Sequence, residues 1–100
     1  MNKLTSHEEI TEYPEIPIRE EYRYPRENTA LKFVLYSRDT EDGKSYSIQC
    51  QRFVNGIKVC QATAADVSAE YDCAAEMYEK IADGEVEPVH LHDVVYDLLP

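Results

Sequence analysis

The stretch that decides the fold is YSIQCQRFVNGIKVCQ, residues 46–61. Tyr46, Ile48 and Cys50 alternate with polar residues, which is the period-two pattern of a half-buried strand. Asn55-Gly56 then interrupts the pattern. This dipeptide favours a type I′ turn, because both central residues of that turn need positive φ. The stretch therefore predicts an antiparallel β-hairpin with a two-residue loop.

A two-residue loop also predicts which residues face each other across the hairpin. The expected pairs are Val54 with Ile57, Arg52 with Val59, and Cys50 with Gln61. In this register one face gathers most of the apolar residues: Tyr46, Ile48, Cys50, Val54, Ile57 and Val59. Phe53 falls on the other face, so we expect either a β-bulge that re-aims it or a second face that is partly covered.

The chain before the hairpin divides into a strand and an arm. Residues 31–38 are rich in apolar and aromatic side chains and predict a strand, and the turn signal TEDG at residues 40–43 joins it to the hairpin. Residues 1–30 hold three of the five prolines and seven glutamates, so we interpret them as an extended or flexible acidic arm. The alternation of Ile10, Ile16 and Ile18 leaves open that part of it is an edge strand.

Two helices are predicted after the hairpin. Ser68 is a reasonable N-cap, Gly84 sits where a helix would stop, and a stripe at helical spacing lies between them: Val67, Tyr71, Ala74, Tyr78 and Ile81. A short second helix has the apolar side Val89, Leu91, Val94, Val95, Leu98 and Leu99. The predicted fold is α+β: residues 31–100 form one domain, a three-stranded antiparallel meander followed by two helices packed on one face.

Charge limits the classes of partner. The chain has 100 residues and a formal net charge of −10, and residues 65–100 hold ten acidic residues against one lysine. Direct binding to nucleic acid or to an anionic membrane is disfavoured, because both depend on Lys and Arg. Three cysteines without paired spacing and an N-terminus without an apolar stretch indicate the reducing cytoplasm.

No catalytic motif stands out. His90, His92 and Asp93 are the one cluster of metal-ligand residue types, but two histidines at i and i+2 diverge on a helix. We therefore favour a structural role for them about four to one and expect no cofactor. The three glycines fall at predicted turns and caps rather than in a phosphate-binding loop. The chain is expected not to be an enzyme.

The remaining surface predicts an interaction or regulatory module. The acidic helical layer and the N-terminal tyrosines are the expected contact residues: Glu70, Glu76, Glu79, Asp83, Tyr22 and Tyr24. The protein partner is unknown, and an exposed sheet edge leaves a homodimer open. One alternative is an acidic nucleic-acid mimic that inhibits a DNA- or RNA-binding protein, and a weaker one is a metal-binding enzyme or sensor.

The C-terminal half resembles a known group of sequences. The Val54-Asn-Gly56 turn and the segment VEPVHLHDVV, residues 86–95, resemble an uncharacterised family of proteins of this length from clostridia and related Firmicutes. Its Pro-x-His-Leu-x-Asp-Val pattern corresponds to Pro88, Val89, His90, Leu91, Asp93 and Val94. The resemblance covers residues 31–99 and implies a cytoplasmic bacterial protein. It transfers neither an activity nor site residues.

Overall fold

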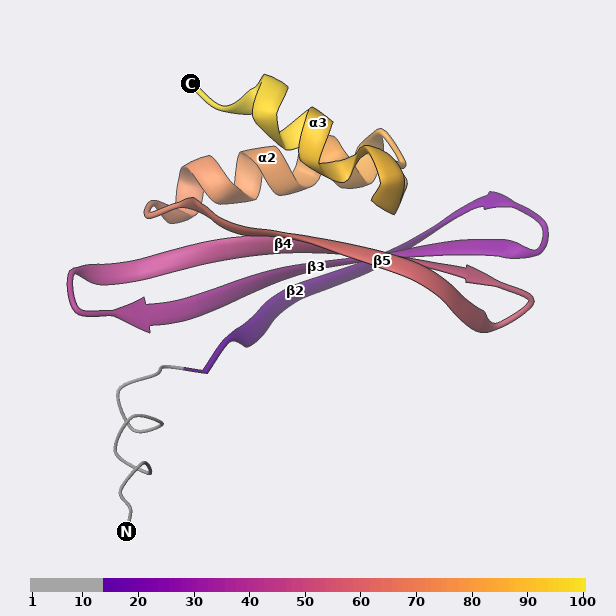
Figure 1. Cartoon of the computed structure of the whole chain (residues 1–100), viewed down its shortest axis with the longest axis horizontal. Coiled ribbons are helices and arrows are strands. Elements are labelled where there is room, and N and C mark those ends of the chain that lie inside the picture. The colour runs from indigo at the N-terminus through magenta and orange to yellow at the C-terminus, as the bar shows by residue number, and fades with distance from the viewer. Residues whose placement is uncertain (1–13) are drawn as a thin grey trace, which may run out of the picture.

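The computed structural model describes residues 14–100. The elements in chain order are β2 (Ile16–Arg26), β3 (Thr29–Thr40), β4 (Gly43–Val54), β5 (Ile57–Ser68), α2 (Tyr71–Asp83), the 3₁₀ turn η1 (Pro88–His90) and α3 (Leu91–Leu98). The strands form one antiparallel sheet in the order β2-β3-β4-β5, so each strand pairs with its neighbour in sequence. Both helices lie on one face of this sheet (Figure 1). The predicted α+β class and two C-terminal helices are confirmed.

The predicted number of strands was wrong, because the sheet has four strands and not three. The additional strand is β2, which occupies residues 16–26 of the segment interpreted as an arm. Its prolines, Pro17 and Pro25, lie near its two ends, beside register shifts in the pairing with β3. An edge strand tolerates proline, because half of its N–H groups do not point at a neighbour. Ile10 and the rest of residues 1–13 lie outside the described residues.

The hairpin between β4 and β5 turns as predicted but changes register further along. Val54 pairs with Ile57, and Asn55 and Gly56 have φ of 52° and 81°, as a type I′ turn needs. A register shift follows between Phe53 and Arg52, so Arg52 pairs with Cys60 and not with Val59, and Cys50 pairs with Ala62 and not with Gln61. Val59 is therefore the extra residue of a β-bulge.

The bulge changes which residues of β5 face the core. A shift of one residue moves every later side chain to the opposite face of a strand. Val59 is the bulge residue itself and is 51% exposed. Ile57 precedes the bulge and pairs with Val54 as predicted, yet it is 67% exposed, so the predicted apolar face of the hairpin is not buried at this end. Ala62 and Ala64 pack against the core in their place.

The core lies between the sheet and the two helices. Alternate residues of β3 and β4 meet the inner sides of α2 and α3, and the residues buried there include Leu31, Phe33, Leu35, Ile48, Cys50, Tyr78, Ile81, Leu91 and Val95. Burying a side chain of this size stabilises the fold by about 1.5–3 kcal/mol. Tyr78 also has a polar group to satisfy, and its hydroxyl donates a 3.0 Å hydrogen bond to the Phe33 carbonyl.

Both ends of α2 differ in detail from the prediction. β5 continues through Ser68, whose hydroxyl accepts a 3.0 Å hydrogen bond from the Glu70 amide, so Glu70 and not Ser68 is the N-cap. The helix does end at Gly84, but Gly84 has φ of −81° and the left-handed residue is Glu85, with φ of 51°. The amides of Glu85 and Val86 donate to the carbonyls of Ala82 and Ile81, which is the Schellman pattern.

Candidate functional site

The face of the sheet opposite the helices carries a hydrogen-bonded polar row. In residues 14–100 no helix covers this face, which we call the open face (Figure 1). Gln49 is at the centre of the row: it accepts hydrogen bonds from the Tyr36 hydroxyl (3.3 Å) and the Gln51 amide (2.6 Å) and donates one to Thr63 (2.9 Å). These bonds hold the middle of the open face in a fixed arrangement.

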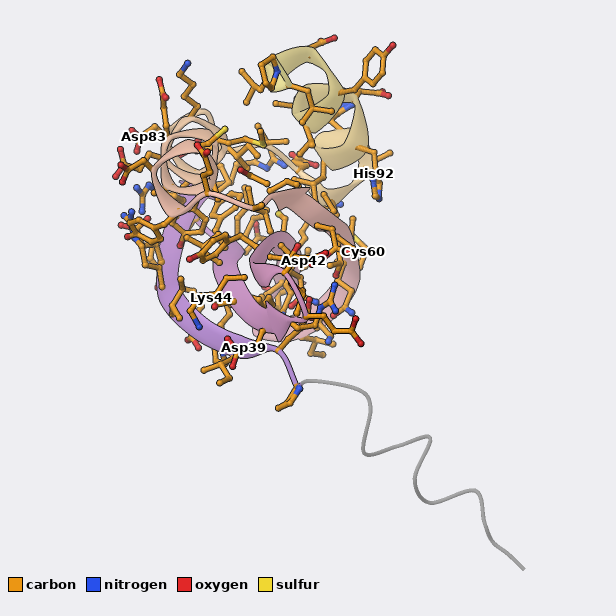
Figure 2. The ribbon with its side chains drawn as sticks, turned by 90° about the vertical axis from the view of Figure 1, so that its left-hand side faces the viewer. Asp39, Asp42, Lys44, Cys60, Asp83 and His92 are labelled. Carbon is orange, nitrogen blue, oxygen red and sulfur yellow. The ribbon has the colours of Figure 1, made fainter. Side chains whose placement is uncertain are left out.

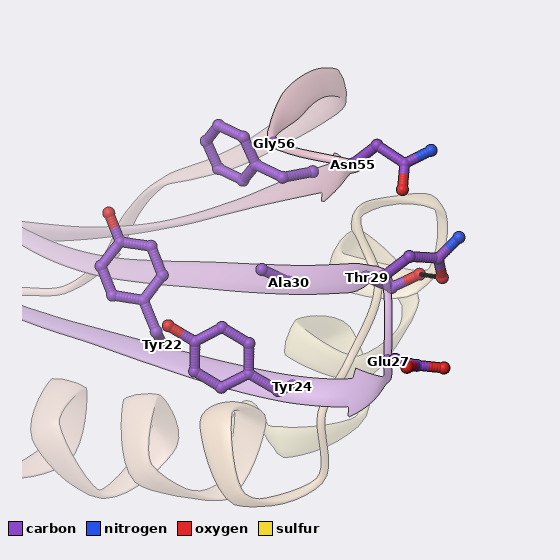
Figure 3. Close-up of a pocket in the computed structure, with 9 residues that line it drawn as sticks. Tyr22, Tyr24, Glu27, Thr29, Ala30, Asn55 and Gly56 are labelled. Carbon is purple, nitrogen blue, oxygen red and sulfur yellow. Dashed lines mark hydrogen bonds between the residues drawn. The ribbon is translucent and has the colours of Figure 1, made fainter.

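A hollow of about 520 Å³ lies at one end of the open face, beside the β2–β3 and β4–β5 turns. Ala30 of β3 pairs with Phe53 of β4, and Tyr22 and Tyr24 belong to β2 on the other side of β3. The small Ala30 side chain therefore lies between aromatic rings carried by the two neighbouring strands (Figure 3). We call this site the aromatic hollow.

The rim of the aromatic hollow is built from the two turns. Glu27, Asn28 and Thr29 come from the first turn, and Asn55 and Gly56 come from the second. The Asn55 amide donates a 2.9 Å hydrogen bond to the Asn28 carbonyl, and the Thr29 hydroxyl donates a 3.3 Å bond to the Asn28 side chain. Because the turns are tied together, the hollow is formed before anything binds.

The aromatic side chains of the hollow are exposed. Tyr24 is 70% exposed and Tyr22 is 47% exposed, and their rings stack with centroids 6.4 Å apart. The Lys32 ammonium lies 5.8 Å from the centre of the Tyr22 ring and 3.6 Å from the Glu20 carboxylate. Exposed aromatic rings around a preformed concave site are typical of a binding surface.

The predicted contact residues fall into two separate groups. Tyr22 and Tyr24 belong to the aromatic hollow on the open face. Glu76, Glu79 and Asp83 lie on α2, on the other side of the sheet, and Glu70 is the N-cap of that helix. The sequence prediction did not distinguish these two surfaces, and the structure does not bring them together.

Three of the four acidic residues of α2 make ion pairs within the chain. The Arg19 guanidinium of β2 lies 3.1 Å from Glu79, and that of Arg23 lies 3.1 Å from Asp83. Glu76 pairs with Lys80 on the same helix at 3.5 Å. Because each pair neutralises a carboxylate, the surface of α2 is less negative than the sequence count implies. Figure 2 shows Asp83 at the outer side of α2.

The histidines of the weak metal candidate do not gather further ligands. His90 ends η1 and is the N-cap of α3, and His92 lies in the first turn of α3, where both are exposed. Figure 2 shows His92 and Asp83 on opposite sides of the helical layer. Among residues 14–100 there is no group of three or more His, Cys, Asp or Glu side chains placed to hold a metal ion.

The three cysteines are free and occupy different environments. Cys50 is fully buried, and its thiol donates a 3.2 Å hydrogen bond to the Val86 carbonyl. Burial, with smaller contributions from Cys60 and Glu87, raises the pKa of the Cys50 thiol to about 12. The thiol is therefore protonated at neutral pH and is a poor nucleophile. Cys60 is exposed on β5, and Cys73 is half-buried on α2.

Sequence reasoning missed most of the aromatic hollow. Tyr22 and Tyr24 were predicted contact residues, but Ala30 and Phe53 were not, and Glu27 was placed in the arm. The register between β2 and β3 is needed to bring these residues together, and the alternation around Tyr22 was the available signal.

These features define a small α+β domain with one helix-covered sheet face and one open face that carries a concave aromatic site. The chain belongs to the family of unknown function DUF6514, whose match covers residues 1–100. The predicted resemblance to an uncharacterised family is thereby confirmed, while the clostridial source and the motif stay predictions. Neither a curated protein nor a solved structure matches the chain. In the described part of the chain, no helix is long and apolar enough to cross a membrane.

Proposed function

We propose that this chain is a small protein-interaction module that acts without catalysis and binds its partner through the aromatic hollow. The observation that carries the proposal is the concave site of about 520 Å³ on the open face, with Tyr24 70% exposed at its wall. Aromatic side chains are enriched at the centres of protein interfaces, because they contribute large apolar area and lose little conformational entropy. The three free cysteines suit a reducing cytoplasm, where we place the protein.

The acidic layer of α2 supports the proposal less strongly. A basic partner that bound Glu79 or Asp83 would compete with Arg19 and Arg23, which already pair with them at 3.1 Å. The nucleic-acid mimic depends on a row of unpaired carboxylates, so these ion pairs weaken it relative to the open face. It nevertheless makes a distinct prediction, because binding through carboxylates falls steeply with salt.

Affinity capture with matched tyrosine variants tests the proposal. The tagged full-length protein captures partners from a lysate of its source organism at low and high salt, and mass spectrometry identifies them. Tyr24→Ser removes a ring from the hollow, whereas Tyr96→Ser removes an equally exposed ring from α3, where Tyr96 is 77% exposed. We expect a partner that Tyr24→Ser loses and Tyr96→Ser retains.

Two other outcomes would contradict the proposal. A partner that both tyrosine variants retain, but that Glu76→Lys or high salt removes, would place the interface on the acidic face of α2. If sedimentation shows a dimer that persists in Tyr24→Ser, the chain associates with itself through another surface, such as a sheet edge.

A further inference from the structure

We infer that the aromatic hollow accepts the side chain of an arginine from the partner protein. This inference rests on the proposed function and specifies the chemical group that the hollow recognises. Three observations carry it: the aromatic rings that line the hollow, the charge of its rim, and a similar arrangement elsewhere in the same chain.

The rings that line the hollow suit one planar group. Tyr24 belongs to β2 and Phe53 to β4, and Ala30 of the intervening strand β3 pairs with Phe53. Adjacent strands are about 4.8 Å apart, so β2 and β4 are separated by about 9.6 Å. This separation leaves space above the small Ala30 side chain, where a planar group can lie against an aromatic ring at a contact distance of about 3.5 Å. A guanidinium is planar and stacks on aromatic rings.

The charge of the rim favours a cation. Among the nine residues that line the hollow in the described part of the chain, Glu27 is the one with a charged side chain. An arginine stacked on these rings can direct its N–H groups towards the Glu27 carboxylate, because the guanidinium carries five donors in its plane. A lysine offers a point charge without the planar surface.

The chain already combines these interactions at a second place. The Arg19 guanidinium lies 4.9 Å from the centre of the Tyr78 ring, and one of its nitrogens lies 3.1 Å from the Glu79 carboxylate. A tyrosine face and a glutamate thus hold an arginine within this protein. The aromatic hollow offers a tyrosine ring and a carboxylate at the surface, and an arginine from a partner would complete the same combination.

A peptide titration tests the inference directly. We would follow the backbone amides of the ¹⁵N-labelled full-length protein by NMR while adding acetyl-Gly-Arg-Gly-amide. The comparison peptide replaces arginine by citrulline, which is nearly the same shape but neutral. We expect weak, saturable shifts at Ala30 and Gly56 with the arginine peptide and at least about threefold weaker binding of the citrulline peptide. Equal binding of the two peptides, or no shift at these amides, would overturn the inference.

Two variants identify the groups that bind the peptide. Glu27→Gln keeps the size of the side chain and removes its charge, and Tyr24→Ala removes one wall. Each should weaken arginine-peptide binding about two- to fivefold, the range of an exposed ion pair or cation–π contact. Glu41→Gln is the matched control, because Glu41 is exposed at the β3–β4 turn, at the opposite end of β3. Unchanged binding in Glu27→Gln would contradict the assignment.

The two proposals fail in different ways. If partner capture depends on Tyr24 but the arginine peptide does not bind, the interaction module stands and the arginine assignment is wrong. If the peptide binds but capture is indifferent to Tyr24, the hollow recognises arginine and is not the partner interface. A dimer that Tyr24→Ala dissociates would identify a second copy of this chain as the occupant and overturn the arginine assignment.

Discussion

Glu85 ends helix α2 in a conformation that glycine adopts at much lower cost. Its φ is 51°, where the Cβ of an L-residue approaches the following carbonyl and costs about 1–2 kcal/mol. Glu85→Gly removes this cost but makes the unfolded chain more flexible, which offsets about 0.4–1 kcal/mol of the gain. The Glu85 side chain is exposed, so its removal leaves the packing unchanged. We expect a net stabilisation of about 0.5–1 kcal/mol.

The same substitution inside the helix should have the opposite sign. Glu76 lies in the interior of α2, where glycine costs about 1 kcal/mol relative to alanine, and it also pairs with Lys80 at 3.5 Å. In thermal unfolding, Glu85→Gly should raise the melting temperature by about 2–8 °C and Glu76→Gly should lower it by at least about 4 °C. If Glu85→Gly lowers the melting temperature as Glu76→Gly does, Glu85 does not adopt the left-handed conformation in solution and the reasoning is refuted.

Four further predictions concern buried or hydrogen-bonded side chains. Tyr78→Phe leaves the Phe33 carbonyl without its donor and should lower the free energy of unfolding by about 1–2 kcal/mol in urea titrations. Iodoacetamide at pH 8 should alkylate Cys60 and spare Cys50 until the protein is denatured. Burial raises the pKa of Cys50 from 9.0 to about 12, so the unfolded chain loses this proton at lower pH than the folded chain. The free energy of unfolding should therefore fall as the pH rises from 9.0 to about 12, and Cys50→Ala should lack this fall. Hydrogen bonds from Ser45 and Arg38 lower the pKa of Asp66 below its ordinary value of 3.8. The stability that the Asp66 carboxylate contributes should therefore be lost as the pH falls below 3.8, and the free energy of unfolding of Asp66→Asn should depend less on pH in this range.

The parts of the fold that were predicted correctly depend on local signals. The turn at Asn55-Gly56 needs positive φ at two adjacent positions, and few dipeptides allow this. The helix around Ala74 and Ile81 follows from their spacing, because a stripe at this period can be buried only if the segment is helical. Each signal lies within a few residues of the structure that it specifies, so it can be recognised without knowledge of the rest of the fold.

The errors concern features that depend on distant residues. The bulge at Val59 cannot be recognised from the alternation of β5, yet it turns Ala62 and Ala64 towards the core. β2 was missed because proline opposes strand structure in general, although it is tolerated at an edge. The aromatic hollow depends on the pairing of β2 with β3, since one of its walls comes from β2 and the other from β4. Tyr24 could be named from the sequence, but its neighbours Ala30 and Phe53 could not.

The missed strand also changes how the charge of the protein is understood. The sequence count assigns the negative charge to the C-terminal part, and it suggested α2 as a continuous acidic surface. β2 brings Arg19 and Arg23 beside that helix from residues 60 positions earlier in the chain, where they pair with Glu79 and Asp83. Such exposed pairs stabilise the fold by only about 0.2–1 kcal/mol each, but they hold the edge strand against the helix and reduce the local charge. The carboxylates of α2 thus help to position β2, and β2 in turn presents Tyr22 and Tyr24 on the open face. The acidic helix therefore supports the strand that forms one wall of the aromatic hollow, and through this strand it would contribute to the binding proposed there.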